Sequence, residues 1–174
     1  MRIYDGSPRQ DFEEVLRSIG AFLDQRGMRD VLLLEAPDGF IVQGLVVEGG
    51  SGTWSESVGR QAKETLTFLD DDIARFMDEA MARRSAEAEE APDSSKAGYY
   101  EKSFRVIGRW MDGERPHDIF FFEQDGAFVV RLQMVTAVGA HHALAEFTKD
   151  DIETMIAEAP QLRQPSAPQK EAGR

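Results

Sequence analysis

Residues 15–24 read VLRSIGAFLD, and residues 103–112 read SFRVIGRWMD. The two segments are 88 residues apart, and Arg, Ile, Gly and Asp recur in them at the same spacing. A helical pattern of apolar residues does not by itself require arginine, glycine and aspartate at matching positions. The match therefore indicates an internal duplication. A duplication decides which fold is predicted, because both copies are expected to adopt the same structure.

The similarity continues downstream of both segments. RDVLLLE at residues 29–35 matches HDIFFFE at residues 117–123 with the same offset. After a connection that is shorter in the second copy, FLDDDI at residues 68–73 matches FTKDDI at residues 147–152 with an offset of 79. We therefore predict two tandem copies of one structural unit.

The sequence pattern of each copy predicts the element order α-β-β-(β)-α. Residues 11–26 and 99–113 carry apolar side chains at helical spacing. Two short apolar runs follow in each copy around an Asp-Gly sequence, which is a strong hairpin signal. A weaker third strand is predicted at residues 63–69 and 143–147, where a buried loop is the alternative, and a second helix follows.

One such unit would be marginally stable alone, because it has a small sheet and a single layer of helices. We therefore expect an α+β fold in which two repeats, related by a pseudo-two-fold axis, share an antiparallel sheet with helices packed on it. The expected boundaries are residues 1–88 for repeat 1, 89–98 for a linker, 99–159 for repeat 2 and 160–174 for a disordered tail. The tail has three prolines and few apolar residues.

The amino-acid composition limits the classes of partner that the protein is expected to bind. The 174 residues include 32 acidic and 20 basic side chains, which gives a net charge of −12 and argues against nucleic acids and anionic membranes. The absence of cysteine excludes disulfides, thiolate metal sites and thiol catalysis. The first residues lack the apolar run of a signal peptide, and we expect a cytoplasmic protein.

Two glycines occupy matching positions in the middle of the predicted helices. A mid-helix glycine costs about 1 kcal/mol relative to alanine, so its presence twice predicts a close backbone approach. The two helices are expected to cross near Gly20 and Gly108, or each helix to lie tightly on the sheet.

Charged side chains are also retained in both copies. Arg17 and Arg105 each follow a glutamate by four residues, which favours an ion pair within one helix. A glutamate at the end of the first strand of each copy is the alternative partner. Asp24, Asp30 and Glu35 also recur, and their repetition predicts structural roles, so we expect no catalytic residue among them.

Residues that differ between the copies are better candidates for binding. Trp54 lies in a glycine-rich connection and could anchor a partner, or fold over the sheet edge. His141 and His142 are adjacent, so on a strand they point to opposite faces and do not predict a shared metal site. A small-molecule cleft between the repeats would be lined by Trp110, the two helix arginines Arg17 and Arg105, or the histidines.

In composition and element order alone, the sequence is similar in outline to type III secretion chaperones and the related YbjN-like proteins, which implies a role in protein binding. No nucleotide, metal or hydrolase motif occurs, and no cofactor is predicted. We therefore expect a soluble non-enzymatic adaptor or chaperone-like protein with a protein partner, as a pseudo-dimeric monomer or a homodimer. The alternatives are a small-molecule-binding protein or enzyme, and a structural subunit of a larger assembly.

Overall fold

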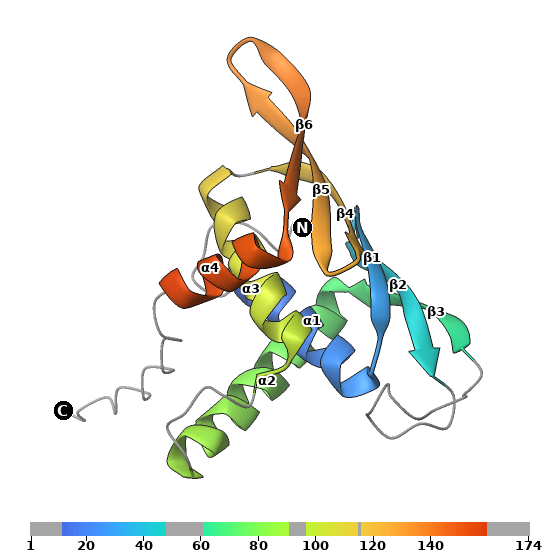
Figure 1. The fold of residues 1–174 in the computed structure, drawn as a ribbon, viewed down its shortest axis with the longest axis vertical. Coiled ribbons are helices and arrows are strands. Elements are labelled where there is room, and N and C mark those ends of the chain that lie inside the picture. The colour runs from blue at the N-terminus through green and yellow to red at the C-terminus, as the bar shows by residue number, and fades with distance from the viewer. Residues whose placement is uncertain (1–11, 48–60, 91–96, 115, 160–174) are drawn as a thin grey trace, which may run out of the picture.

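A computed structural model describes residues 12–47, 61–90, 97–114 and 116–159 (Figure 1). Trp54 and the predicted C-terminal tail lie outside the described residues. The elements along the chain are α1 (Phe12–Arg26), β1 (Arg29–Ala36), β2 (Gly39–Val47), β3 (Gln61–Leu69), α2 (Asp70–Glu90), α3 (Tyr99–Glu114), β4 (His117–Gln124), β5 (Ala127–Thr136), β6 (Gly139–Phe147) and α4 (Lys149–Glu158).

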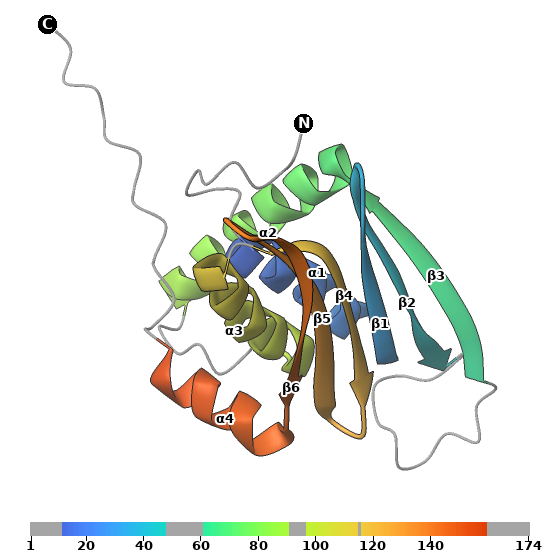
Figure 2. The ribbon, with the colours of Figure 1, turned by 90° about the horizontal axis from the view of Figure 1, so that it is seen from above.

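The six strands form one antiparallel sheet in the order β3-β2-β1-β4-β5-β6. Its centre is the pairing of β1 with β4, in which Leu33 lies opposite Phe121. The third strands, which the sequence predicts weakly, are present and form the two edges. Figure 2 shows the four helices on one side of the sheet, so the predicted α+β fold is confirmed.

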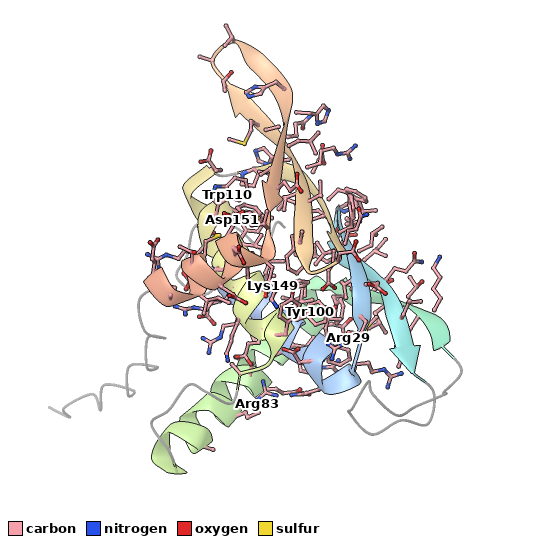
Figure 3. All side chains as sticks on the ribbon, in the orientation of Figure 1. Arg29, Arg83, Tyr100, Trp110, Lys149 and Asp151 are labelled. Carbon is pink, nitrogen blue, oxygen red and sulfur yellow. The ribbon has the colours of Figure 1, made fainter. Side chains whose placement is uncertain are left out.

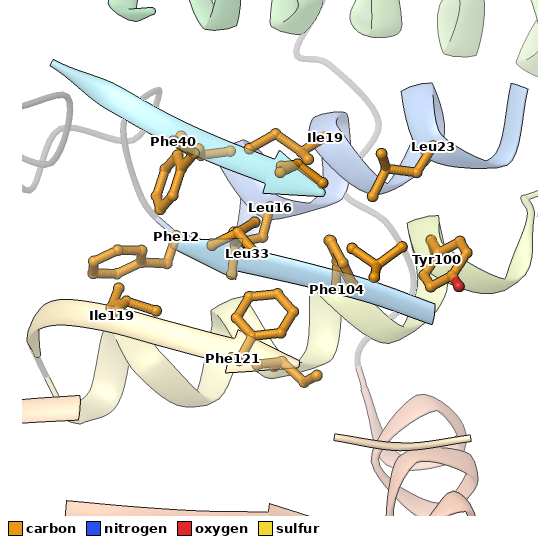
Figure 4. Packing of buried hydrophobic residues seen from close by; sticks show 14 of the residues in the cluster. Phe12, Leu16, Ile19, Leu23, Leu33, Phe40, Tyr100, Phe104, Ile119 and Phe121 are labelled. Atoms are coloured by element: carbon orange, nitrogen blue, oxygen red, sulfur yellow. The ribbon is translucent and has the colours of Figure 1, made fainter. Parts of the chain in front are cut away.

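The core lies between α1, α3 and the inner face of the sheet (Figure 4). The apolar stripes of the two helices meet the inward side chains of the central strands, and both sets are fully buried. From the helices these are Leu16, Ile19, Leu23, Phe104 and Ile107, and from the strands Val31, Leu33, Phe40, Ile119 and Phe121. Phe104 packs edge-on against Phe121, with 4.9 Å between ring centroids. The predicted helical spacing thus identifies the face that packs on the sheet.

The two Asp-Gly sequences form different turns. In the second hairpin Asp125 and Gly126 are the two turn residues, and both have positive φ, as a tight hairpin requires. In the first hairpin the turn residues are Pro37 and Asp38, and Gly39 already begins β2. Proline cannot adopt positive φ, which explains why the first turn differs.

Thr148 caps the start of α4. Its side chain accepts a hydrogen bond from the backbone N–H of Asp151, whose carboxylate accepts one from the backbone of Thr148. This reciprocal pair fixes the start of α4 directly after β6. Within the described part of the chain, no helix combines the length and the apolar character needed to cross a bilayer.

Candidate functional site

Helices α1 and α3 approach each other at two glycines. A Cβ atom on Gly20 would clash with the backbone carbonyl of Tyr100, and one on Gly108 would clash with that of Phe12. The glycines are therefore required for the crossing, as the sequence predicts. The space between these helices is filled by backbone and offers no room for a ligand at this point.

Each of the two helices is capped by an aspartate from the other. The backbone N–H groups of Phe12 and Glu13 donate to the carboxylate of Asp112, at 2.8 and 3.1 Å. Those of Tyr100 and Glu101 donate to Asp24, at 3.0 and 2.8 Å. Free N–H groups at a helix start need such acceptors, and negative charge there is favourable. Asp24 thus has a structural role.

Burial raises the pKa of the Asp24 carboxyl above its ordinary value of 3.8, although the two backbone hydrogen bonds oppose the shift. The folded protein therefore binds this proton more tightly than the unfolded chain does. The stability that Asp24 contributes is fully present below pH 3.8 and is lost as the pH rises through the folded pKa. We expect wild-type protein to lose stability relative to Asp24→Asn over this interval, measured by urea unfolding. A carboxyl resonance titrating at or below 3.8 would contradict this expectation.

The shortest ion pairs of Arg17 and Arg105 join the two helices. The Nε of Arg17 donates to Glu101 at 3.2 Å, and the Nε of Arg105 donates to Glu13 at 3.0 Å. The prediction that each arginine pairs with the glutamate four residues before it is therefore wrong. The alternative with the strand glutamates is also wrong, because the close crossing brings the opposite helix nearer than the sheet. Arg17 is buried, and Glu14 also contacts it at 3.5 Å.

The strand glutamates instead bind backbone N–H groups across the centre of the sheet. Glu35 accepts from the N–H of Ile119 at 3.0 Å, and Glu123 accepts from the N–H of Val31 at 3.4 Å. Both N–H groups follow an aspartate with positive φ, at an irregularity in the strand pairing. The glutamates thus satisfy donors that the strand ladder leaves open.

Glu123 has a second donor, the buried hydroxyl of Tyr100. Burial and the neighbouring carboxylate both raise the pKa of Tyr100, so its hydroxyl stays protonated and donates. This contact ties the first turn of α3 to β4. Four of the repeated carboxylates, those of Asp24, Asp112, Glu35 and Glu123, therefore lie along the α1–α3 crossing and the central strands, where each accepts hydrogen bonds from the fold.

The opposite face of the sheet carries apolar side chains that no described helix covers. Directly paired residues of neighbouring strands point to the same face, and the pairs Leu32–Phe122, Leu34–Phe120, Leu34–Ile41 and Phe122–Val129 all point away from the helices. We call these six residues the open sheet face: Leu32, Leu34, Ile41, Phe120, Phe122 and Val129. Leu34 is 37% exposed, and the other five are half-buried by one another and by neighbouring strands.

The charges beside the open sheet face differ from those of the whole chain. The register places Lys63, Arg131 and Glu146 on the same side of the sheet. The guanidinium of Arg131 lies over the ring of Phe120, 5.5 Å from its centroid. Lys63 and Arg131 therefore place basic groups beside an apolar centre in a chain with a net charge of −12, and Glu146 places an acidic group there.

The hairpin of β5 and β6 projects beyond the helices (Figure 1). His141 and His142 lie on it, both exposed, and their register partners are Met134 and Gln133. Trp110 lies apart from them on α3, beside α4 and β6 (Figure 3), and packs edge-on against Phe147. The histidines, Trp110 and the two arginines are therefore not brought together in one site.

Of the six residues of the open sheet face, only Phe120 and Phe122 carry a signal in the sequence. The available signal was the run Phe120–Phe122, since consecutive phenylalanines place large apolar groups on both faces of a strand. Only Phe121 of the three is fully buried under the helices. The run thus predicts either burial on both sides or an occupied surface, and no described element covers Phe120 and Phe122.

Comparisons with protein-family models, with curated proteins and with solved structures found no match.

Proposed function

We propose that this chain is a non-enzymatic protein-binding protein, an adaptor or chaperone-like molecule, and that the open sheet face contacts the partner. The observation that carries the proposal is the contiguous apolar surface over β2, β1, β4 and β5, with no described element packed on it. Soluble proteins rarely leave such a surface free unless something binds there. Two rigid central phenylalanines can supply much of the energy of an interface.

The side chains around the face favour one kind of partner. An apolar segment flanked by acidic residues would place its apolar groups on Phe120 and Phe122 and its carboxylates near Lys63 and Arg131. A strongly basic partner would be repelled by Lys63 and Arg131. The net acidity of the whole chain opposes long-range attraction of an acidic partner, so the two basic groups act only at short range. We therefore expect binding that depends mainly on apolar contact and weakly on salt concentration.

We expect Leu34→Glu to abolish capture of the partner. Leu34 is 37% exposed on the open sheet face, so a carboxylate there reaches water in the free protein but is buried by a bound partner. The measurement is affinity capture from native extract with quantitative mass spectrometry, followed by binding assays with the purified partner. A loss of affinity of at least tenfold corresponds to about 1.4 kcal/mol.

Val138→Glu is the matched control. Val138 is 99% exposed in the turn of the β5–β6 hairpin, away from the open sheet face. It receives the same charge and should retain the partner. Equal loss in both variants, or capture that neither variant changes, would refute binding through this face.

We further propose that the fold arose from two copies of one α-β-β-β-α unit, residues 1–88 and 99–159, related by a pseudo-two-fold axis between β1 and β4. Reciprocal contacts support this. Asp24 caps α3 as Asp112 caps α1, and Arg17 pairs with Glu101 as Arg105 pairs with Glu13. In each case both partners are shifted by 88 residues, which is the offset of the sequence match.

A small-molecule site between the copies has less support. Arg17 and Arg105, its predicted cationic residues, are engaged by glutamates of the opposite helix. The helix backbones also meet directly at Gly20 and Gly108. A ligand at this crossing would have to displace both ion pairs.

A further inference from the structure

The β5–β6 hairpin combines three properties that suggest an interface along its outer edge. It projects from the molecule (Figure 1). Val135, Val138 and Leu144 on it are 63%, 99% and 75% exposed. Residues 132–145 contain no Asp, Glu, Lys or Arg, although such residues make up 30% of the whole chain.

The outer edge of β6 is also unprotected. β6 is the last strand of the sheet, and among the described residues no strand pairs with its outer edge. Exposed edges are normally blocked by lysine, proline, bulges or inward charges. β5 and β6 pair without interruption from Phe128–Phe147 to Thr136–Gly139, so β6 has no bulge. It contains no proline and a single charged residue, Glu146.

The opposite edge of the sheet differs. β3 carries Lys63 and Glu64, and Glu64 is held by Arg26 through two hydrogen bonds of 3.0 and 2.6 Å. Charged side chains at this edge discourage pairing with another strand. The contrast indicates that the two edges of the sheet have different roles, and that the β6 edge is the one suited to strand addition.

We propose that β6 pairs antiparallel with β6 of a second copy of this chain, which joins the two sheets into one. The charge distribution favours a second copy as the occupant. Two chains of net charge −12 repel each other, so they can approach only through a surface that is free of charge, and the hairpin supplies one on both sides. Antiparallel pairing about a two-fold axis near the middle of β6 places the two Glu146 carboxylates at opposite ends of the seam.

Such a dimer would bury a strip along one strand and not a broad face. Interfaces below about 1,200 Å² are typically weak, so we expect association in the micromolar range. The new strand pair would satisfy the open backbone groups of β6 in both copies. It would leave both open sheet faces accessible, so a dimer could hold two partner molecules.

The test is sedimentation equilibrium of the full chain over a concentration series. Wild-type protein should shift from 19.5 kDa toward twice that mass, and Leu144→Glu should remain monomeric. Leu144 lies opposite Arg131 within the hairpin, so a glutamate there gains a favourable cross-strand neighbour in the monomer. In the dimer, the two copies of this glutamate would add two further carboxylates to the contact between the paired β6 strands.

Two controls make the result specific. Leu69→Glu changes a leucine that is 52% exposed at the other edge of the sheet, and it should dimerise like the wild type. Leu34→Glu changes the open sheet face and should also dimerise. Amide hydrogen exchange should slow with concentration in residues 139–147 and not in β3.

A wild-type chain that stays monomeric throughout, or Leu144→Glu dimers as stable as wild-type dimers, would overturn the proposal. Loss of dimers in Leu34→Glu alone would also overturn it, because the interface would then be the open sheet face. Leu144 lies opposite Arg131, so Leu144→Glu bears on partner capture as well. Leu34→Glu separates the two proposals, because it should dimerise without capturing the partner.

Discussion

Replacing Gly108 with alanine is expected to lower the free energy of unfolding by about 3 kcal/mol. The new Cβ would clash with the backbone carbonyl of Phe12, and a backbone atom cannot rotate away as a side chain end can. Overpacking of this kind typically costs about 1–3 kcal/mol and sometimes more, whereas the higher helix propensity of alanine returns only about 1 kcal/mol. Chemical denaturation with circular dichroism measures the difference.

Gly113→Ala is the matched control in the same helix. A Cβ atom at Gly113 would meet nothing within 4 Å, so only the gain in helix propensity should remain, up to about 1 kcal/mol. Opposite signs for the two alanine variants would confirm that the α1–α3 crossing requires glycine. Equal effects would mean that the helices can separate without cost.

Arg17→Met is expected to destabilise the fold by about 3–5 kcal/mol. The Arg17 side chain is 4% exposed, and its ion-pair partner Glu101 is 12% exposed. Removing one member of a buried pair leaves the other charge desolvated and uncompensated. The double variant Arg17→Met, Glu101→Leu should recover most of the loss, because two apolar side chains replace the whole pair.

Arg105→Met tests the dependence on burial. The Arg105 and Glu13 side chains are 13% and 20% exposed, and Glu13 also lies 3.7 Å from Arg109. Water and Arg109 can partly compensate the negative charge of Glu13 when Arg105 is replaced. The loss in the free energy of unfolding should therefore be smaller than for Arg17→Met. A larger loss at Arg105 would contradict the assignment of Arg17 as the more buried cation. Thermal and urea unfolding of these single variants and of the double variant Arg17→Met, Glu101→Leu measure the differences in the free energy of unfolding.

The fold was largely predictable because its signals are local and periodic. Apolar spacing located the helices, and alternating or apolar runs located the strands, including the weaker pair that became the edges. The glycines at positions 20 and 108 also predicted a close approach correctly, since glycine weakens a helix unless a neighbouring backbone needs the space. The first turn was less predictable, because Pro37 excludes the geometry that Asp125 and Gly126 adopt.

Long-range pairing was not predictable from spacing. Glu13 stands four residues before Arg17 in the sequence, but the helix crossing places it beside Arg105 instead. Helical spacing gives the neighbours within one helix and carries no information on which residues a second helix brings closer. The sequence left two possibilities for the strand that carries Phe120–Phe122, burial on both faces or an occupied surface, because an apolar run does not reveal whether a second layer covers it.

The exchange of aspartate caps between α1 and α3 has a consequence for how fast the chain folds. The hydrogen bonds that cap the first turn of α1 are accepted by Asp112, 100 residues away from Phe12 in the sequence. Those that cap the first turn of α3 are accepted by Asp24, 76 residues away from Tyr100. Neither helix can complete its start from local contacts, so both must close a long loop first. Loop closure over such distances slows folding of otherwise helical segments. The amide groups of both helices should therefore become protected from hydrogen exchange at the same late stage of folding. The rate should be that at which the two halves of the chain come into contact.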